Sequence, residues 1–447
     1  MADSTTNPTS PTTGPTAITP APGADASSAT TVQTAAAPQK ERTFNPYQVF
    51  IISIIAIIQF TVILDFMVLS PLGAILMPAL HISPSHFGLV VSAYAFSAGA
   101  AGLLTAGFAD KFDRKKLLLF FYVGFILGTF LCAIAPDYPF LLAARIVTGV
   151  FGGVIGSISL AIVTDLFRLE VRGRVMGFVQ MAFAASQVLG LPLGLVLANR
   201  FGWHSPFFMV GSFGALVGVV IVIYMRPITE HLKLKSDRNA FVHLYKTVSQ
   251  VPYLKAFLAT TLLATGGFML MPFGSAFSIH NLGLKIEQLP LLYGLTGIAA
   301  VVMGPLTGKL SDKIGKYNMF CIGTFISIVM VAIYTNLGVT PFWVLVVINI
   351  ILFTGIMARM ISASALMTAI PVPAERGAFM SVNSSVQQFS GGIASMVAGL
   401  IVLEGYGGTL LHYNTLGYVV IAAMLICVYL LYFINKSIVQ KQHKAQP

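Results

Sequence analysis

Long apolar stretches without charge, separated by short polar turns, dominate this chain. After Arg42 no Asp, Glu, Lys or Arg occurs until Asp65, and none again until Asp110. Similar gaps recur to the end, among them the long one over residues 317–358. A helix needs roughly 20 apolar residues to cross the hydrocarbon of a bilayer, so the longest stretches hold most of two crossings. The short alternating segments typical of barrel strands do not occur, and the pattern predicts a helical bundle.

Dividing these stretches at charges and turn residues gives twelve membrane-spanning helices. The first six are predicted near 48–75, 87–109, 116–135, 139–164, 174–199 and 205–226. The second six are predicted near 253–278, 289–308, 317–337, 341–367, 377–403 and 412–435. A polar, basic segment separates the two sets. The predicted domains are therefore two six-helix bundles, 44–226 and 251–435, a cytoplasmic linker, 227–250, and cytoplasmic tails, 1–43 and 436–447.

The composition supports a membrane protein: 56% of the 447 residues are hydrophobic and 9% are charged. Soluble domains carry roughly a quarter charged residues. The net charge of +11 reflects topology rather than a nucleic-acid partner, because 22 of the 26 Lys and Arg residues lie on one side if the amino terminus is inside. By the positive-inside rule both termini are cytoplasmic, and we expect the protein in the cell inner membrane.

Signals for secretion, disulfides and metals do not appear. Residues 1–39 hold no Lys or Arg and no basic start followed by an apolar stretch, so they are interpreted as a disordered tail rather than a signal peptide. Cys132, Cys321 and Cys427 all fall in predicted spans without disulfide or metal spacing, and the eight histidines are scattered. We therefore expect no metal and no cofactor.

The two sets of spans repeat each other in register, which indicates duplication with a substrate site between the halves. Span 4 is followed by Arg172-Gly173-Arg174 and span 10 by Arg376-Gly377-Ala378. The loop after span 2 reads Ala106-Gly-Phe-Ala-Asp110-Lys-Phe-Asp113-Arg114, and the loop after span 8 reads Gly308-Lys-Leu-Ser-Asp312-Lys-Ile-Gly315-Lys316.

These loops resemble the major facilitator superfamily signature Gly-x-x-x-Asp-(Arg/Lys)-x-Gly-(Arg/Lys), and the chain is most similar to the twelve-span drug and sugar efflux group. The second copy matches the signature fully, whereas the first has Ala106 and Asp113 at the glycine positions. The resemblance covers about residues 45–435. It implies two six-helix bundles related by a pseudo-twofold axis, with spans 1, 4, 7 and 10 lining the cavity.

The repeated loops are interpreted as a conformational latch that holds one state and breaks in the other. Asp110 can cap a neighbouring helix, where the dipole is positive, and Arg114 can reach Asp165. The alternative is that the charges only fix topology. The complete set of latch residues is Asp110, Arg114, Asp165, Gly308, Asp312, Gly315 and Lys316.

Asp65 is the one acid deep within a predicted span, which makes it a functional candidate. Arg145 of span 4 lies at a similar depth, and its segment Arg145-Ile-Val-Thr-Gly149 resembles the Arg-x-x-x-Gly pattern of the family. The resemblance implies proton coupling by this acid and arginine. The guanidinium stabilises the carboxylate whereas burial destabilises it, so an entering substrate can shift the balance. The alternative is a static pair that orients two helices.

Further polar residues within the spans are candidates for substrate binding. Arg359 follows a long charge-free run and is suited to an anionic or polyhydroxylated substrate, or else extends to the inner surface. The others are Gln180, Gln187, Asn383, Gln387 and Thr261, which serve helix packing in the alternative interpretation. In span 5, Gly190-Leu-Pro192 partly resembles the glycine–proline element of exporters.

Together these features predict a secondary transporter that moves a small organic solute by alternating access, with efflux of a drug-like compound or sugar coupled to protons. A proton-driven importer and a passive facilitator share most of the features. A membrane enzyme is disfavoured because no catalytic cluster occurs at one depth, and an ATP-driven pump because no Gly-x-x-x-x-Gly-Lys-(Ser/Thr) loop exists. The expected partners are the solute, protons and the lipid bilayer, and the expected state is a monomer.

Overall fold

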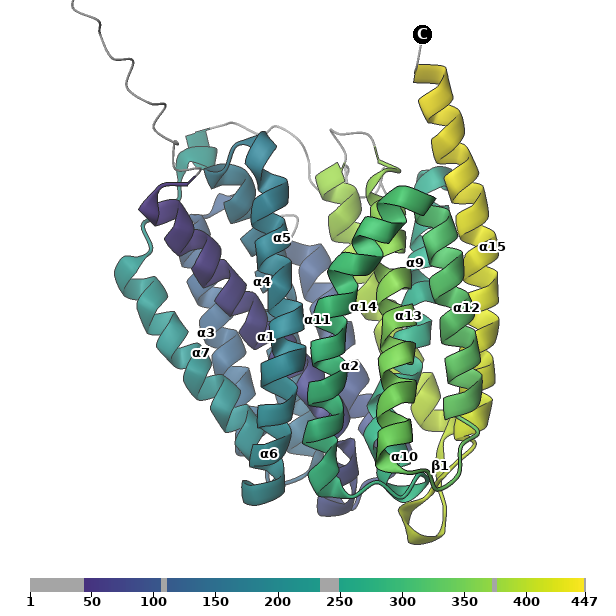
Figure 1. Cartoon of the computed structure of the whole chain (residues 1–447). Coiled ribbons are helices and arrows are strands. Elements are labelled where there is room, and N and C mark those ends of the chain that lie inside the picture. Colours follow the sequence, from purple (N-terminus) through teal and green to yellow (C-terminus); the bar gives the residue numbers. More distant parts are fainter. Residues whose placement is uncertain (1–43, 106–110, 234–248, 372–375, 446–447) are drawn as a thin grey trace, which may run out of the picture. The chain divides into compact units, whose positions relative to one another are not determined.

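Helices make up almost all of the described chain (Figure 1). The computed structural model describes residues 44–105, 111–233, 249–371 and 376–445. Residues Pro46–Pro447 form one compact unit, separate from Met1–Asn45. Every described helix and strand lies in the unit that begins at Pro46, so this unit carries the membrane-spanning fold.

The part before the linker contains six spans. Five are single helices: α1 (Pro46–Leu80), α2 (Pro84–Thr105), α3 (Arg114–Ala133), α4 (Tyr138–Leu166) and α7 (Ser205–Tyr224). The fifth span is composite, with α5 (Leu169–Ala185), the π-helical turn η2 (Ser186–Gly190) and α6 (Leu191–Phe201). The wide turn ends two residues before Pro192, which has no N–H to continue the α-helical ladder.

The part after the linker contains six more spans. One is broken into α9 (Val251–Leu270), the 3₁₀ turn η4 (Met271–Phe273) and α10 (Gly274–His280). The others are α11 (Leu289–Ile314), α12 (Lys316–Tyr334), α13 (Phe342–Thr368), α14 (Arg376–Ile401) and α15 (Tyr413–Ala445). A short antiparallel pair, β1 (Leu403–Glu404) and β2 (Leu410–Leu411), connects α14 to α15.

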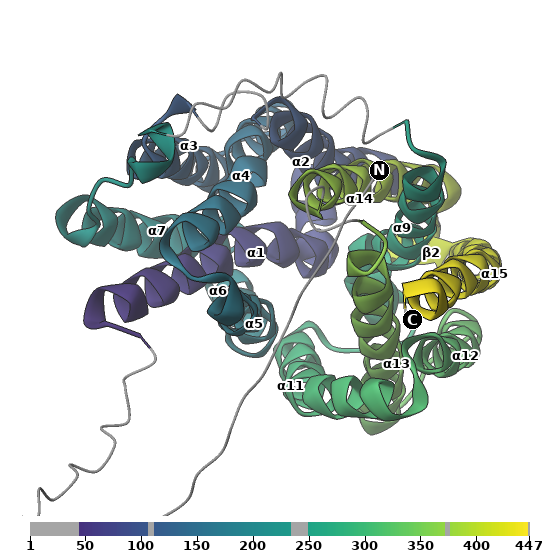
Figure 2. The ribbon, with the colours of Figure 1, turned by 90° about the horizontal axis from the view of Figure 1, so that it is seen from above.

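Within the described residues, eleven helical stretches are long and apolar enough to cross a membrane. The predicted span that is not among these eleven, near 377–403, corresponds to α14, which is more polar because Ser, Asn and Gln occupy much of its first half. It packs against α2 and α9, as the view along the helices shows (Figure 2). The predicted all-α membrane fold is confirmed.

The break between α9 and α10 follows from Pro272 and is stabilised from four other helices. Proline cannot donate to the carbonyl of Phe268, and Ser395 of α14 donates to that carbonyl instead, at 3.1 Å. The Met271 carbonyl accepts from Ser70 of α1 at 2.7 Å. Tyr413 of α15 donates to the Leu270 carbonyl at 3.2 Å, and Tyr334 of α12 to the Gly274 carbonyl at 3.3 Å. These side-chain hydrogen bonds to backbone carbonyls around the break tie α9 and α10 to their surroundings.

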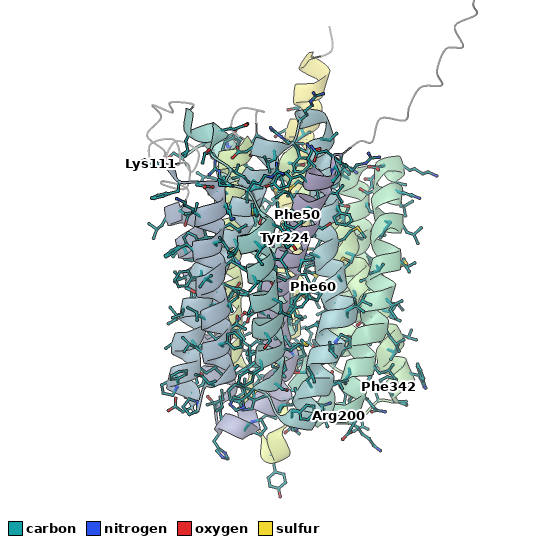
Figure 3. The ribbon with its side chains drawn as sticks, turned by 90° about the vertical axis from the view of Figure 1, so that its left-hand side faces the viewer. Phe50, Phe60, Lys111, Arg200, Tyr224 and Phe342 are labelled. Atoms are coloured by element: carbon teal, nitrogen blue, oxygen red, sulfur yellow. The ribbon has the colours of Figure 1, made fainter. Side chains whose placement is uncertain are left out.

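The outer surface of the helices is apolar, as contact with lipid requires. Phe120, Leu216 and Phe325 are among many large side chains that are exposed. Lys111 and Arg200 lie at opposite ends of the helices (Figure 3). The two residues, predicted to lie on different sides of the membrane, are thus at opposite ends of the bundle.

Candidate functional site

A cavity of about 490 Å³ is lined by helices from before and after the linker. The helices that the resemblance places around the substrate, α1, α4, α9 and α13, all contribute residues to it. The volume is in the range of pockets for drug-sized ligands. The arrangement can therefore hold a small organic molecule between the two parts of the chain.

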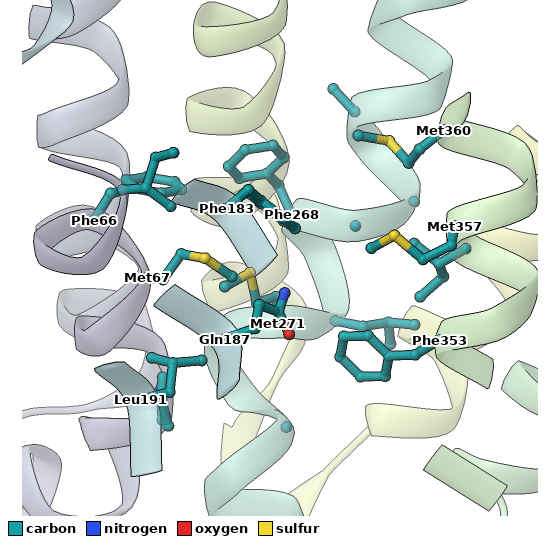
Figure 4. A pocket seen from close by; sticks show the side chains of 18 of the residues that line it. Phe66, Met67, Phe183, Gln187, Leu191, Phe268, Met271, Phe353, Met357 and Met360 are labelled. Atoms are coloured by element: carbon teal, nitrogen blue, oxygen red, sulfur yellow. The ribbon is translucent and has the colours of Figure 1, made fainter. Parts of the chain in front are cut away.

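Aromatic side chains and methionines make up 13 of the 39 described residues that line the cavity, and several of them gather on one part of the wall (Figure 4). The prominent side chains are Phe66, Met67, Phe183, Phe268, Met271, Phe353, Met357 and Met360. Methionine is flexible and polarisable, so such a wall adapts to apolar ligands of different shape. Gln187 projects among them from the π-helical turn η2.

Asp65 and Arg145 form an ion pair in the interior of the first six spans. Arg145 Nη1 lies 2.8 Å from Asp65 Oδ2, and both side chains are 0% exposed. The Thr129 hydroxyl of α3 lies 3.1 Å from Asp65 Oδ1, although it is also 3.0 Å from the carbonyl of Phe125. Nε and Nη2 of Arg145 are buried without a hydrogen-bond partner among the described residues. The pair is thus dry and only partly satisfied by hydrogen bonds.

Tyr94 separates this pair from the cavity. Its ring centroid lies 4.6 Å from the guanidinium carbon of Arg145, within the range of a cation–π interaction. Tyr94 lines the cavity, whereas neither Asp65 nor Arg145 does. Tyr94 is not among the residues predicted from the sequence. Any effect of a ligand on the ion pair in this conformation must therefore pass through the Tyr94 ring or through a change in helix packing.

The other candidate binding residues divide into two sets. Arg359, Gln187 and Gln387 line the cavity. Gln180, Asn383 and Thr261 do not: Gln180 is exposed, Asn383 accepts a hydrogen bond from Thr260 at 2.6 Å, and Thr261 accepts one from Ser390 at 2.9 Å. The last two contacts join α9 to α14. Among the described residues, no group of three His, Cys, Asp or Glu side chains is placed to hold a metal ion.

Several polar residues of the cavity were missed by the sequence analysis. Gln59 of α1 and Asn349 of α13 both line it. Each is an amide within a stretch that is otherwise apolar, so the cost of an amide in lipid was the signal that could have identified them.

Comparison with known proteins decides the family. A model of the Major Facilitator Superfamily matches residues 55–395 and 256–447. The chain belongs to the Major Facilitator Superfamily. It is a multi-pass membrane transporter and not an enzyme, and the resemblance predicted from the sequence is confirmed.

Two relatives and one solved structure illustrate the similarity. The MFS-type transporter YceJ of Bacillus subtilis is 27% identical over 285 residues, 64% of this chain and 72% of that protein. Multidrug resistance protein 2 of the same organism is 28% identical over 280 residues, 60% and 70% of the two chains. A bacterial homologue of the human lysosomal transporter Spinster has the same fold, with a TM-score of 0.69 at 14% identity over 88% of this chain and 98% of that chain.

The first copy of the superfamily loop departs from the signature for a structural reason. Asp113 has φ of −55°, so its position needs no glycine, and its side chain accepts from the backbone N–H of Lys115 at 2.9 Å to cap α3. It also accepts from the backbone N–H of Ile228 at 3.0 Å. The structure brings Arg114 Nε to 2.9 Å from Asp165 Oδ2. Asp110 lies outside the described residues.

The second copy follows the signature, and Gly315 shows why. Its φ of +93° between α11 and α12 lies in the region that favours glycine. Lys316 pairs with Asp312 at the surface, where the aspartate side chain is 71% exposed. Gly308 has open space around its α-carbon. The two copies therefore differ in burial, because Arg114 and Asp165 are 5% and 19% exposed.

The latch hypothesis predicts unequal effects of the two ion pairs. Arg114→Gln should shift the protein toward the conformation in which the ends of α2 and α14 beside this loop separate, because it removes the less exposed pair between α3 and α4. Distances between spin labels on those ends measure the shift. Lys316→Gln is the control, since an exposed pair contributes roughly 0–1 kcal/mol. Unchanged distances and transport in Arg114→Gln would leave the charges a topological role alone.

Proposed function

We propose that this chain exports a small organic solute, a drug-like compound or a sugar, across the inner membrane in exchange for protons. The two six-helix halves, residues 44–226 and 251–435, move against each other so that the cavity opens to each side in turn. The observation that carries the proposal is the Asp65–Arg145 pair: it is fully buried, yet the ring of Tyr94 connects it to the cavity wall.

The proton step follows from the partners of Asp65. As a carboxylate it accepts from Arg145, with Thr129 also within reach, and these contacts connect α1 to α4 and α3. Protonation removes the negative charge, so Arg145 loses its counter-ion and the attraction between α1 and α4 weakens. A solute that displaces Tyr94 changes the environment of the guanidinium from the cavity side. Solute and proton thus bias the same helix contacts, which is the requirement for coupled transport.

Export is favoured over import by two observations. A relative at 28% identity is named a multidrug resistance protein, and the Gly190-Leu191-Pro192 element begins at the end of the π-helical turn η2, with Gln187 of this turn and Leu191 lining the cavity. The excess of Lys and Arg in the predicted inner segments supports the proposal that both termini are cytoplasmic. One chain supplies the whole cavity, which is compatible with a monomer.

The proposed exchange predicts that flux depends on the direction of the pH gradient. Purified protein is reconstituted into liposomes, and uptake of candidate solutes is followed with the gradient imposed in each direction. Solute should accumulate against its gradient only when protons flow the opposite way. Flux in the direction of the protons would establish a symporter, and flux indifferent to the gradient a passive facilitator.

A further inference from the structure

We infer that the transported solute is an amphiphilic organic anion, whose acidic group binds Arg359 and whose apolar body lies on the phenylalanine and methionine wall. The inference names the substrate class for the cavity and rests on the transport function proposed above. It comes from the charge, the partners and the accessibility of Arg359.

The cavity has an uncompensated positive charge. Among the described residues that line it, Arg359 is the one with a formal charge, and no Asp or Glu belongs to the lining. The deep acid, Asp65, is not part of the wall and already pairs with Arg145. An organic cation in this cavity would meet repulsion and no counter-ion, whereas an anion would meet an unpaired guanidinium.

Arg359 has no partner that explains its burial. The residue is 3% exposed, and its Nε and Nη2 are buried without a hydrogen-bond partner in the described parts of the chain. The ring of Phe320, 5.7 Å from the guanidinium carbon, is its aromatic neighbour. A guanidinium can donate two parallel hydrogen bonds to a carboxylate or sulfonate. Because Nε and Nη2 are enclosed, a bound acid would meet the guanidinium at Nη1, beside Gly266, and would supply the counter-ion that the fold leaves out.

The neighbouring helix leaves space beside the guanidinium. Gly266 of α9 also lines the cavity, and a Cβ atom at this position would lie only 3.5 Å from Arg359 Nη1. A larger side chain would cover the charged group. The next residue, Gly267, lines the cavity as well, but a Cβ atom there would meet nothing within 4 Å. Substitutions at Gly266 and Gly267 can therefore be compared: both add a side chain to the same helix beside the cavity, but only the one at Gly266 lies next to the guanidinium of Arg359.

The rest of the wall fits the apolar part of such a solute. Phe353, Met357 and Met360 belong to the same helix as Arg359 and line the cavity with it. Gln187 and Gln387 supply amide donors that can meet further acceptor atoms. One charged group surrounded by adaptable apolar side chains selects ligands by charge more than by shape.

The test is equilibrium binding of matched ligands at pH 7 to the full chain in lipid nanodiscs, with empty nanodiscs subtracted. The probes are 1-naphthaleneacetate, 1-naphthaleneacetamide and 2-(1-naphthyl)ethylamine, and the same three polar groups on a biphenyl body. We expect each carboxylate to bind about tenfold or more tightly than its amide, with the amine weakest. Arg359→Gln should remove the difference between carboxylate and amide, and Arg359→Lys should retain part of it.

Two controls separate ligand binding from a structural role. Gly266→Leu should weaken carboxylate binding, whereas Gly267→Leu, with the same added volume, should keep the preference for the carboxylate. Ligand-free Arg359→Gln should melt at a higher temperature than the wild type, because an uncompensated buried charge is removed.

The inference is overturned if the wild type binds the amine or amide as tightly as the carboxylate, or if it binds none of the probes. It is also overturned if Arg359→Gln keeps the carboxylate preference, or if this variant melts lower with unchanged ligand preference. Equilibrium binding is measured without a pH gradient. The binding result therefore stands even if transport proves independent of protons. Equally, loss of the anion preference would leave gradient-driven flux intact.

Discussion

Asp65→Asn is expected to abolish uphill transport while the protein still folds, binds solute and exchanges it down its own gradient. Asparagine has nearly the volume of aspartate and mimics its protonated form, and a neutral amide is less costly in lipid than a carboxylate. The side-chain carbonyl of the introduced asparagine can still accept from Arg145, but no proton can be released. Accumulation, exchange and melting temperature are measured on one preparation.

The alternative role of the pair gives the opposite pattern. The same change leaves Arg145 buried without its counter-ion in either role, which costs on the order of 3–5 kcal/mol. If Asp65 only orients α1 and α4, this loss of stability is the whole effect, and uphill transport and exchange are lost together. Expression and melting temperature should then fall together, and adding Arg145→Gln should restore them. Thr129→Val is a matched control, since it keeps the volume and the ion pair and removes a neighbouring hydroxyl. Intact pH-driven accumulation in a stable Asp65→Asn protein would exclude Asp65 from the mechanism.

Gly149→Ala is expected to lower stability markedly, although it adds only a single methyl group. A Cβ atom at this position of α4 would overlap Ser97 Oγ and lie 2.5 Å from the carbonyl oxygen of Tyr94. The serine hydroxyl can rotate away, but the carbonyl belongs to the backbone of α2, so the two helices must separate. Overpacking of this kind costs about 1–3 kcal/mol. Thermal melting of the purified protein measures the effect.

Gly149→Ala should also weaken the coupling of solute transport to protons. Arg145 lies one helical turn before Gly149 on α4, so a shift of α2 would move Tyr94 relative to Arg145. Gly156→Ala is the control on the same helix, because a Cβ atom there meets only the Gln59 amide at 3.8 Å. It should be neutral or stabilising by about 0.4–1 kcal/mol. Equal melting temperatures for the two variants would show that α2 and α4 adjust freely at this contact.

The sequence could predict the spans because an uncharged run of about 20 apolar residues is typical of a helix that crosses a bilayer. It could not predict where helices end, since α15 continues through Lys436 to Ala445 beyond the apolar part. The break at Pro272 was missed as well, because hydropathy is unaffected by it. The side chains that hydrogen-bond to the carbonyls around the break come from distant segments of the sequence.

The sequence identified the charged residues of the candidate site but not which of the amides line the cavity. Asp65 and Arg145 stand out because ionisable groups are costly in lipid, and the structure brings them together. Amides are less costly, so their sequence positions say little about which face of a helix meets the cavity. Gln180 and Gln187 share a face of one span, but seven residues separate them by about 10 Å along the axis. Only Gln187 reaches the depth of the cavity.

The polar character of α14 has a consequence for how the chain enters the membrane during synthesis. Lipid alone is a poor solvent for a helix with this many Ser, Asn and Gln residues, so insertion of α14 depends on protein surfaces that are already present. Its partners α2 and α9 are both translated before it. Correct insertion late in translation therefore depends on helices made early. If α2 were misplaced, α14 would lack its partner in the membrane, and α15 would then insert in the wrong orientation.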